Sequence, residues 1–148
     1  MSGVEGVEQV RERLKAKLRQ VAGETTEKAV TALLITGKTY SFELTPVDSS
    51  VLINSQYVKT WKTDLGWSGA VYYEAPYAAA VHDMPGTLKG LPRANFGRTA
   101  DGVEFGGGTG SGNYWDPDAE PQFLRKGMEA MGQEATVILR SIYESTPT

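Results

Sequence analysis

The single histidine of the chain, His82, is followed directly by Asp83, and this pairing raises the question of acid–base chemistry. A histidine base needs an orienting carboxylate and a nucleophile within hydrogen-bonding reach. Adjacent side chains on a helix point about a quarter-turn apart, so we expect Asp83 to be a poor partner for His82. Serines at positions 49, 50, 55 and 68 lack the G-x-S-x-G context of a nucleophile elbow. A structural role for His82 is therefore favoured over catalysis.

Two further stretches have the composition of ligand sites without the spacing. The run GGGTGSG at 106–112 is not followed by the Lys and the helix start of a phosphate-binding loop. The acidic stretch DPDAE at 116–120 has Pro121 sixth and Gly127 twelfth from Asp116, where a calcium loop needs glycine and glutamate. Asp118 and Glu120 suit the N-terminus of a following helix instead. We expect no enzymatic activity, no cofactor and no metal.

Composition sets the class of protein. The 148 residues carry a net charge of −3 and no cysteine, which excludes disulfides, thiolate catalysis and cysteine-based metal sites. No broad basic field attracts nucleic acid, and the basic residues within 11–19 are expected to be a solvated face, with an acidic partner or passing DNA as the alternative. The charged N-terminal stretch and the lack of a ~20-residue apolar run predict a soluble protein with no membrane partner.

The elements that would position these residues follow from periodicity and turn chemistry. Residues 4–44 are predicted to form N-terminal helices, because apolar residues recur at spacings of three and four, at Val7, Val10, Leu14, Leu18 and Val21. Gly23 is predicted to end the first helix and Thr25 or Thr26 to cap the second. Thr36, Thr39, Tyr40 and Phe42 favour strand in the second half of that helix, and Pro46 ends it.

The rest of the chain is predicted to complete one domain, residues 1–148. Residues 45–83 are expected to hold a sheet and a short helix: strands at 51–53, 57–65 and 70–73, the last two as a hairpin punctuated by Gly66 and Gly69, and a helix from Pro76 through His82. Residues 84–120, rich in glycine and proline, predict a long loop or arm with short strands near 103–105 and 114–115. Residues 121–145 predict a C-terminal helix that begins at Pro121.

Three segments, in this order, resemble the signatures of one protein family. TPVDSSVLINS resembles TP-x-D-T-G-x-L-x-x-S, through Asp48, Leu52 and Ser55. EAPYAAAVHD resembles a strand, then Pro-Tyr-Ala, then V-H/E-[D/E], through Pro76, Tyr77, His82 and Asp83. EPQFLRKGMEA resembles x-P-x-F-L-R-x-A, through Phe123 and Leu124.

The family is that of the small minor capsid, or tail-completion, proteins in the neck of long-tailed phages. The resemblance spans about Thr45 to Ala130. Ser49–Ser50 stand where the family has Thr-Gly, and Gly127 where alanine is common.

This resemblance implies an α+β fold: a small, mainly antiparallel sheet, N- and C-terminal helices packed on one face, and a long Gly-rich loop or hairpin arm. It implies a structural virion protein, made in the host cytoplasm, that forms a homo-oligomeric ring, hexamer or dodecamer, and completes the tail or joins it to the head connector. Other expected partners are neighbouring connector or adaptor proteins and tail tube or terminator proteins, with DNA only passing through the channel. The expected interface residues are Phe96, Phe105, Tyr114, Trp115 and Arg125.

Other functions stay open from the sequence alone. Within the same class, the alternatives are a tail terminator and a head-closure adaptor. From other classes, the alternatives are a small hydrolase that uses His82 and a carbohydrate-binding module with Trp61, Trp67 and Trp115 as stacking platforms.

Overall fold

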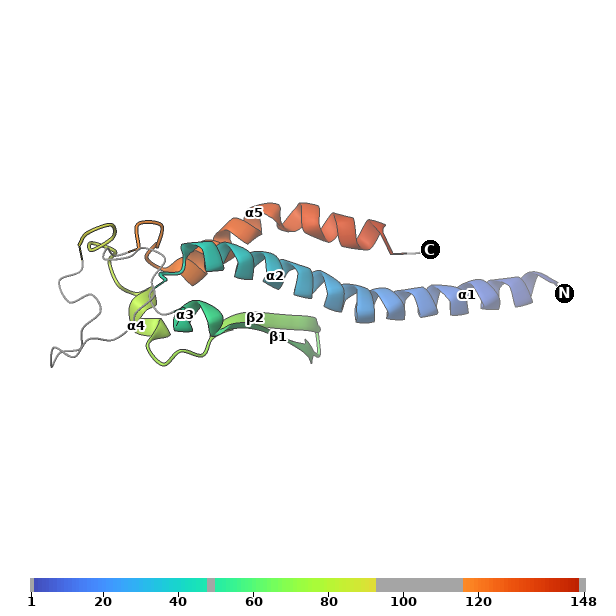
Figure 1. Cartoon of the computed structure of the whole chain (residues 1–148). Coiled ribbons are helices and arrows are strands. Elements are labelled where there is room, and N and C mark those ends of the chain that lie inside the picture. Colours follow the sequence, from blue (N-terminus) through green and yellow to red (C-terminus); the bar gives the residue numbers. More distant parts are fainter. Residues whose placement is uncertain (1, 48–49, 93–115, 147–148) are drawn as a thin grey trace.

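The computed structural model describes residues 2–47, 50–92 and 116–146. Its elements are α1 (Ser2–Gln20), a π-helical turn η1 (Val21–Thr25), α2 (Thr26–Leu44), α3 (Val51–Asn54), β1 (Gln56–Thr63), β2 (Gly66–Tyr73), α4 (Ala78–His82) and α5 (Phe123–Glu144). In Figure 1, α2 lies between the β1–β2 hairpin and α5, so both helices are on one side of the sheet, and α1 extends beyond this body. The predicted α+β class is confirmed.

The N-terminal helices form one continuous rod, so the prediction that Gly23 ends a helix is wrong. The chain passes through Gly23 in the π-helical turn, where the Thr26 amide donates to the Val21 carbonyl. The Thr26 hydroxyl also donates to Val21 O, at 2.6 Å, instead of capping a new helix, and the Thr25 side chain makes no capping bond. An extra residue in one wide turn thus keeps the main chain helical where a stop was expected.

The strand signal in the second half of this rod is also wrong, because α2 runs to Leu44. The hydroxyls of Thr36 and Thr39 donate to the carbonyls of Ala32 and Ile35, four residues back, at 3.0 and 2.9 Å. This hydrogen bond accommodates a β-branched threonine in a helix. A propensity scale gives threonine one average value and so does not register the bond at a particular position.

The predicted hairpin is confirmed, with β1 antiparallel to β2 and Gln56 opposite Tyr73. Gly69 lies within β2 rather than ending a strand, because Leu34 of α2 packs directly over it: a Cβ there would lie 2.4 Å from Leu34 Cδ1. The inner face of the hairpin, including buried Val71, therefore rests on α2.

The strand predicted at 51–53 is wrong, because Val51–Asn54 form the single-turn helix α3. Ser50 precedes it in the left-handed conformation, with φ of 63°. Leu52 and Ile53, adjacent in sequence, are both buried, which a helical turn against several neighbours allows and a half-exposed strand does not.

The α2–α5 crossing holds the C-terminal helix close to the rod. A Cβ built on Gly127 would lie 2.1 Å from Ser41 Oγ and 2.5 Å from its main-chain nitrogen. Ser41 is fully buried, and its hydroxyl donates to Gly37 O at 2.7 Å. Helix α5 begins two residues after Pro121, at Phe123, and short side chains let the two helices meet at this point.

The predicted 84–120 arm is described at its two ends only, and neither end contains a helix or a strand. The short strands predicted near 103–105 and 114–115 lie outside the described residues. Among the helices that the structure describes, none is both long and apolar enough to cross a membrane.

Candidate functional site

The three sequence segments that carry the family resemblance meet at one end of the body, near α3, α4 and the start of α5. Leu52 and Phe123 are buried there in one cluster with Ala75, and Leu124 packs against it. The ring of His82 lies edge-on to Phe123, with centroids 5.1 Å apart. We call this group the motif corner. Asp48, from the first segment, lies outside the described residues.

His82 has a partner that the sequence argument did not foresee. Its Nδ1 lies 3.1 Å from Asp83 Oδ1, so the expectation that Asp83 is poorly placed is wrong. The His82 carbonyl also accepts the Gln122 amide, at 2.8 Å, which ties α4 to the residue before α5. The hydroxyl of Ser55 donates to Leu52 O at 2.7 Å. The contacts of His82 in the described chain thus join elements together.

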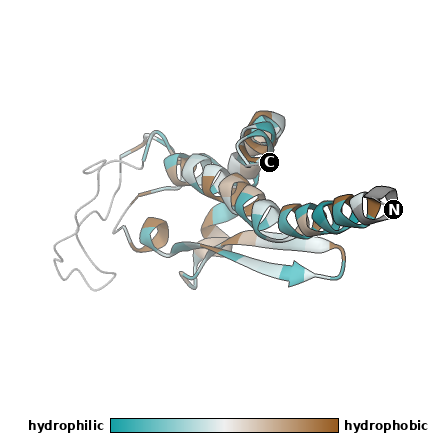
Figure 2. Ribbon diagram, turned by 90° about the vertical axis from the view of Figure 1, so that its right-hand side faces the viewer, coloured by the Kyte–Doolittle hydropathy of each residue, from teal (hydrophilic) through white to brown (hydrophobic). Residues whose placement is uncertain are grey.

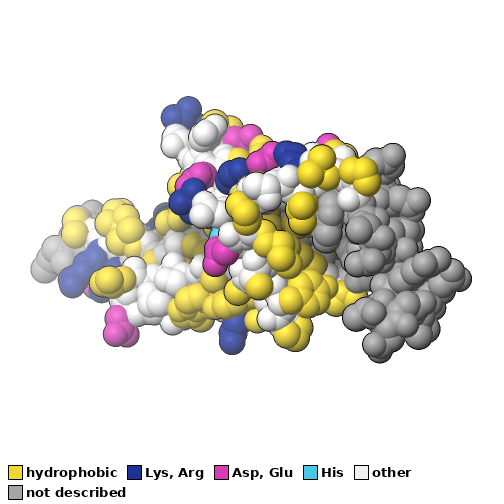
Figure 3. Space-filling view, turned by 90° about the vertical axis from the view of Figure 1, so that its left-hand side faces the viewer, with side chains coloured by type: hydrophobic (Ala, Val, Ile, Leu, Met, Phe, Trp, Pro, Cys, Tyr) yellow, Lys and Arg dark blue, Asp and Glu magenta, His cyan; other side chains and the backbone are white. Residues whose placement is uncertain are grey.

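Pro76 and Tyr77 lie on the outside of the motif corner. Tyr77 is 43% exposed. Pro76 precedes α4 in a turn rather than starting it, and the helix begins at Ala78. Seen from this end of the molecule, hydrophobic side chains cover much of the described surface (Figure 3). In the segment that follows α4, Met84, Leu88 and Leu91 are each about half exposed.

A buried polar network crosses from α2 to the hairpin beside the motif corner. The Tyr73 hydroxyl lies 2.7 Å from Thr45 Oγ1 and accepts from Gln56 Nε2 at 2.9 Å. Thr45 also donates to Ser41 O, and Gln56 to Lys38 O. Burial raises the pKa of Tyr73, and the Thr45 hydrogen bond partly opposes that rise. The phenol is therefore neutral at physiological pH and acts as a hydrogen-bonding junction.

Glu120 anchors the segment before α5. Its carboxylate accepts from Lys126 at 2.8 Å and also pairs with Lys89, from the other described end of the predicted arm. The Lys126 and Lys89 hydrogen bonds lower the pKa of Glu120 to about 2. Its amide donates to Leu44 O at 2.9 Å. The sequence assigned Glu120 to a helix N-terminus, and it instead bridges two lysines.

Of the five predicted interface residues, only Arg125 lies in the part of the chain that the structure describes. Phe96, Phe105, Tyr114 and Trp115 lie outside the described residues. Arg125 is exposed on α5 and lies 3.6 Å from Glu129. The proposed stacking platform is not formed as predicted: Trp61 pairs across the hairpin with Ser68 and Trp67 with Lys62, so the two indoles lie on opposite faces.

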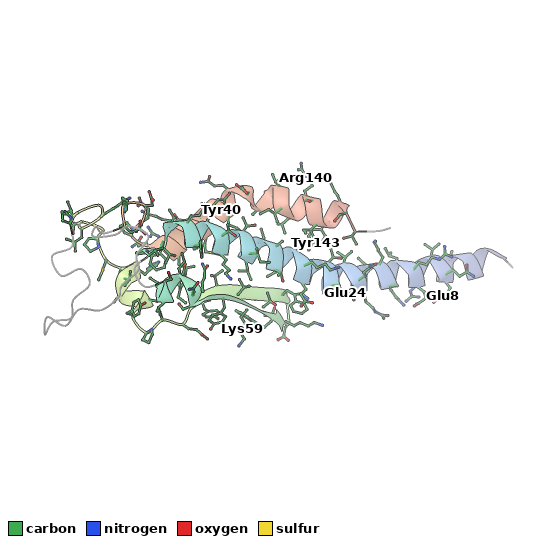
Figure 4. The ribbon with its side chains drawn as sticks, viewed as in Figure 1. Glu8, Glu24, Tyr40, Lys59, Arg140 and Tyr143 are labelled. Carbon is green, nitrogen blue, oxygen red and sulfur yellow. The ribbon has the colours of Figure 1, made fainter. Side chains whose placement is uncertain are left out.

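Two further apolar surfaces are exposed in the described chain, one on α1 and one on the hairpin; the sequence analysis named only Trp61 among their residues as a candidate site. The first, here the arm stripe, consists of Val7, Val10, Leu14 and Leu18 on α1, which are 58–67% exposed. The second, here the hairpin face, is the side of the sheet turned away from α2. Figure 4 shows Lys59 on that side, pointing away from the helices. Tyr57, Trp61 and Tyr72 share this face, each more than a third exposed, and the rings of Tyr57 and Tyr72 stack at 5.1 Å.

The arrangement presents surfaces for contact rather than a converging set of reactive groups. Among the described residues, no group of three or more histidine and carboxylate side chains is placed to hold a metal ion. Comparison of the chain with protein-family models, curated proteins and solved structures found no match.

Proposed function

We propose that this protein is a non-enzymatic, structural subunit of a phage head–tail junction, where copies form a ring that completes the tail or joins it to the head connector. The proposal joins the sequence resemblance to the surfaces described above. Its expected neighbours are further copies of the chain, the connector and the tail proteins.

The observation that supports this role best is the state of the β1–β2 hairpin. It is a two-stranded sheet, and neither outer edge pairs with another strand in the described part of the chain. A strand edge offers unpaired amides and carbonyls to a neighbouring chain. The outer edge of β1 differs from that of β2, so pairing one with the other is a heterologous contact, which repeats around a ring if the rotation closes.

The hairpin face strengthens this argument. Three aromatic side chains, Tyr57, Trp61 and Tyr72, stay exposed beside these edges. Aromatic residues are enriched at protein interfaces, where they bury a large area at a small cost in conformational entropy. A neighbouring subunit that pairs with an edge would also cover these rings.

The proposal is tested by light scattering of the purified protein, followed by negative-stain imaging of any large species. We expect closed rings. Replacing Thr60 of β1 with proline, and in a separate variant Trp61 with aspartate, should reduce ring formation, whereas Gln133→Asp on the exposed side of α5 should not. Binding of isolated connector and tail proteins to the same preparation then distinguishes completion from terminator and adaptor roles. Protein that stays free of rings, alone and when mixed with connector and tail proteins, would refute the proposal.

A further inference from the structure

The arm stripe is an exposed apolar surface on a helix, formed by side chains that are 58–67% exposed. Its spacings of three, four and four residues keep Val7, Val10, Leu14 and Leu18 on one side of a straight helix. Figure 2 shows hydrophobic and hydrophilic residues alternating along α1. In proteins, most of the stability of a helix comes from packing of its apolar side rather than from intrinsic propensity. We therefore expect a second helix to pack against the stripe.

The stripe lies on the side of the rod that α5 covers further along. Val21, the next member of the pattern, is bonded through its carbonyl to Thr26 across the π-helical turn, which stacks these residues one above the other. The Thr26 hydroxyl lies 2.9 Å from Tyr143 OH, near the C-terminal end of α5. Helix α5 ends at Glu144, and α1 continues for about 28 Å beyond that region with its stripe uncovered.

Charge selects the direction in which another copy of α1 can pack on this stripe. Residues 6–12 contain Glu8, Glu12 and Arg11, a net charge of −1, whereas residues 13–19 contain four basic side chains, a net charge of +4. Parallel pairing places the two +4 segments together. Antiparallel pairing places each +4 segment beside the −1 segment of the other copy, which brings Glu8 to the basic half of its partner.

Space selects the same direction. Helix α5 runs antiparallel to α2 and ends beside η1. A partner α1 that runs antiparallel to the first α1 begins where α5 of the first copy ends, and it continues in the direction of α5. A parallel partner leads instead into its own α2 beside the α2 of the first copy, where α5 already lies. The antiparallel arrangement places the two bodies at opposite ends of the pair, as Figure 1 allows.

We infer that α1 is a self-pairing element, and that two copies of this chain bind through their arm stripes as an antiparallel, twofold-symmetric helix pair. Val7 of one copy then lies near Leu18 of the other, and the partner's stripe covers the exposed valines and leucines. This inference goes beyond the proposed ring, because the pair uses α1, forms with or without the hairpin contacts, and has its own test.

The test uses one substitution in the stripe and a matched control. Leu14→Glu places a charge in the middle of the stripe, and Gln9→Glu adds the same charge on the opposite, exposed side of α1. Sedimentation equilibrium at several concentrations measures self-association of each full-length variant. We expect Leu14→Glu to weaken pairing at least about 30-fold and Gln9→Glu to leave it within a factor of about 3. Circular dichroism verifies that both variants fold.

The direction of pairing is determined by disulfide crosslinking. The chain has no native cysteine, so only the introduced cysteines can form disulfides. Under mild oxidation, a mixture of the Val7→Cys and Leu18→Cys variants should form mainly the mixed disulfide. A predominance of Val7→Cys homodimer would show parallel pairing and overturn the inference. A dimer that persists in Leu14→Glu, or wild-type protein that does not self-associate, would also overturn it. Loss of rings in the hairpin variants with pairing retained would confirm the two contacts as separate.

Discussion

Gly127 offers a stringent test of how α5 is held against the rod. Any Cβ at this position meets three atoms of Ser41, at 2.1, 2.5 and 2.7 Å, and two of these atoms belong to the main chain of α2. Main-chain atoms cannot rotate away, so Gly127→Ala must push the two helices apart. Gly132 lies on the same helix, and a Cβ there meets nothing within 4 Å. Gly132→Ala is therefore the matched control.

The expected magnitude follows from two opposing effects. Alanine gains about 1 kcal/mol over glycine in a helix interior, and this gain applies at both positions. Overpacking that moves the main chain costs about 3 kcal/mol, so Gly127→Ala should lower the free energy of unfolding by about 2 kcal/mol. For a chain of this size, that corresponds to a melting temperature about 4–8 °C lower, whereas Gly132→Ala should raise it by about 2–4 °C.

The assay is thermal unfolding followed by circular dichroism at fixed protein concentration, with urea unfolding as a second measure. Fixed concentration matters because self-association shifts the midpoint. The decisive quantity is the difference between the two variants. If Gly127→Ala is as stable as Gly132→Ala, the close approach of α5 to Ser41 is wrong, and with it the packing that defines the body.

Further predictions concern two polar groups near the motif corner, the Tyr73 hydroxyl and the Glu120 carboxylate. Tyr73→Phe removes a partner of both Thr45 and Gln56 and should lower the free energy of unfolding by about 1–2 kcal/mol in urea, whereas Tyr72→Phe on the exposed hairpin face should change it by less than about 0.5 kcal/mol. Glu120 has a pKa of about 2 in the folded protein against 4.5 ordinarily, so its contribution to stability is present above pH 4.5 and is lost as the pH falls towards 2. In Lys126→Met the pKa of Glu120, measured by NMR titration, should rise towards its ordinary value; an unchanged pKa would show that Lys126 does not hold this carboxylate.

Periodicity predicted the long elements well and their boundaries poorly. The spacing of apolar residues placed α1, α2, α5 and the hairpin, because these patterns extend over many residues. It failed where one local interaction decides the outcome. The π-helical turn carries the rod through Gly23, and hydroxyl-to-carbonyl bonds keep Thr36 and Thr39 helical. The left-handed Ser50 directs 51–54 into a helical turn, although their composition favours strand.

The sites were harder to predict, because a sequence shows which residues are apolar but not which of them are covered. The stripe of α1 and the buried face of α2 have similar patterns, yet α5 covers only α2. The exposure of the arm stripe depends on where α5 ends, at Glu144, more than a hundred residues away in the chain. Likewise, Trp61 and Trp67 form no common platform because of the hairpin register.

An apolar face that remains exposed in a folded subunit indicates a contact with another molecule, because a continuous apolar surface gives a solvated helix or sheet no stability. In this protein the two exposed faces differ in the contacts they permit. The strand edges of the hairpin are unlike each other and so favour a contact that repeats in one direction. Helix α1 has a net charge of −1 over residues 6–12 and +4 over residues 13–19, so it is complementary to a second copy of itself in the reverse direction. A subunit with both kinds of surface can build rings through one and join copies in pairs through the other, and the hairpin and arm variants separate these two contacts.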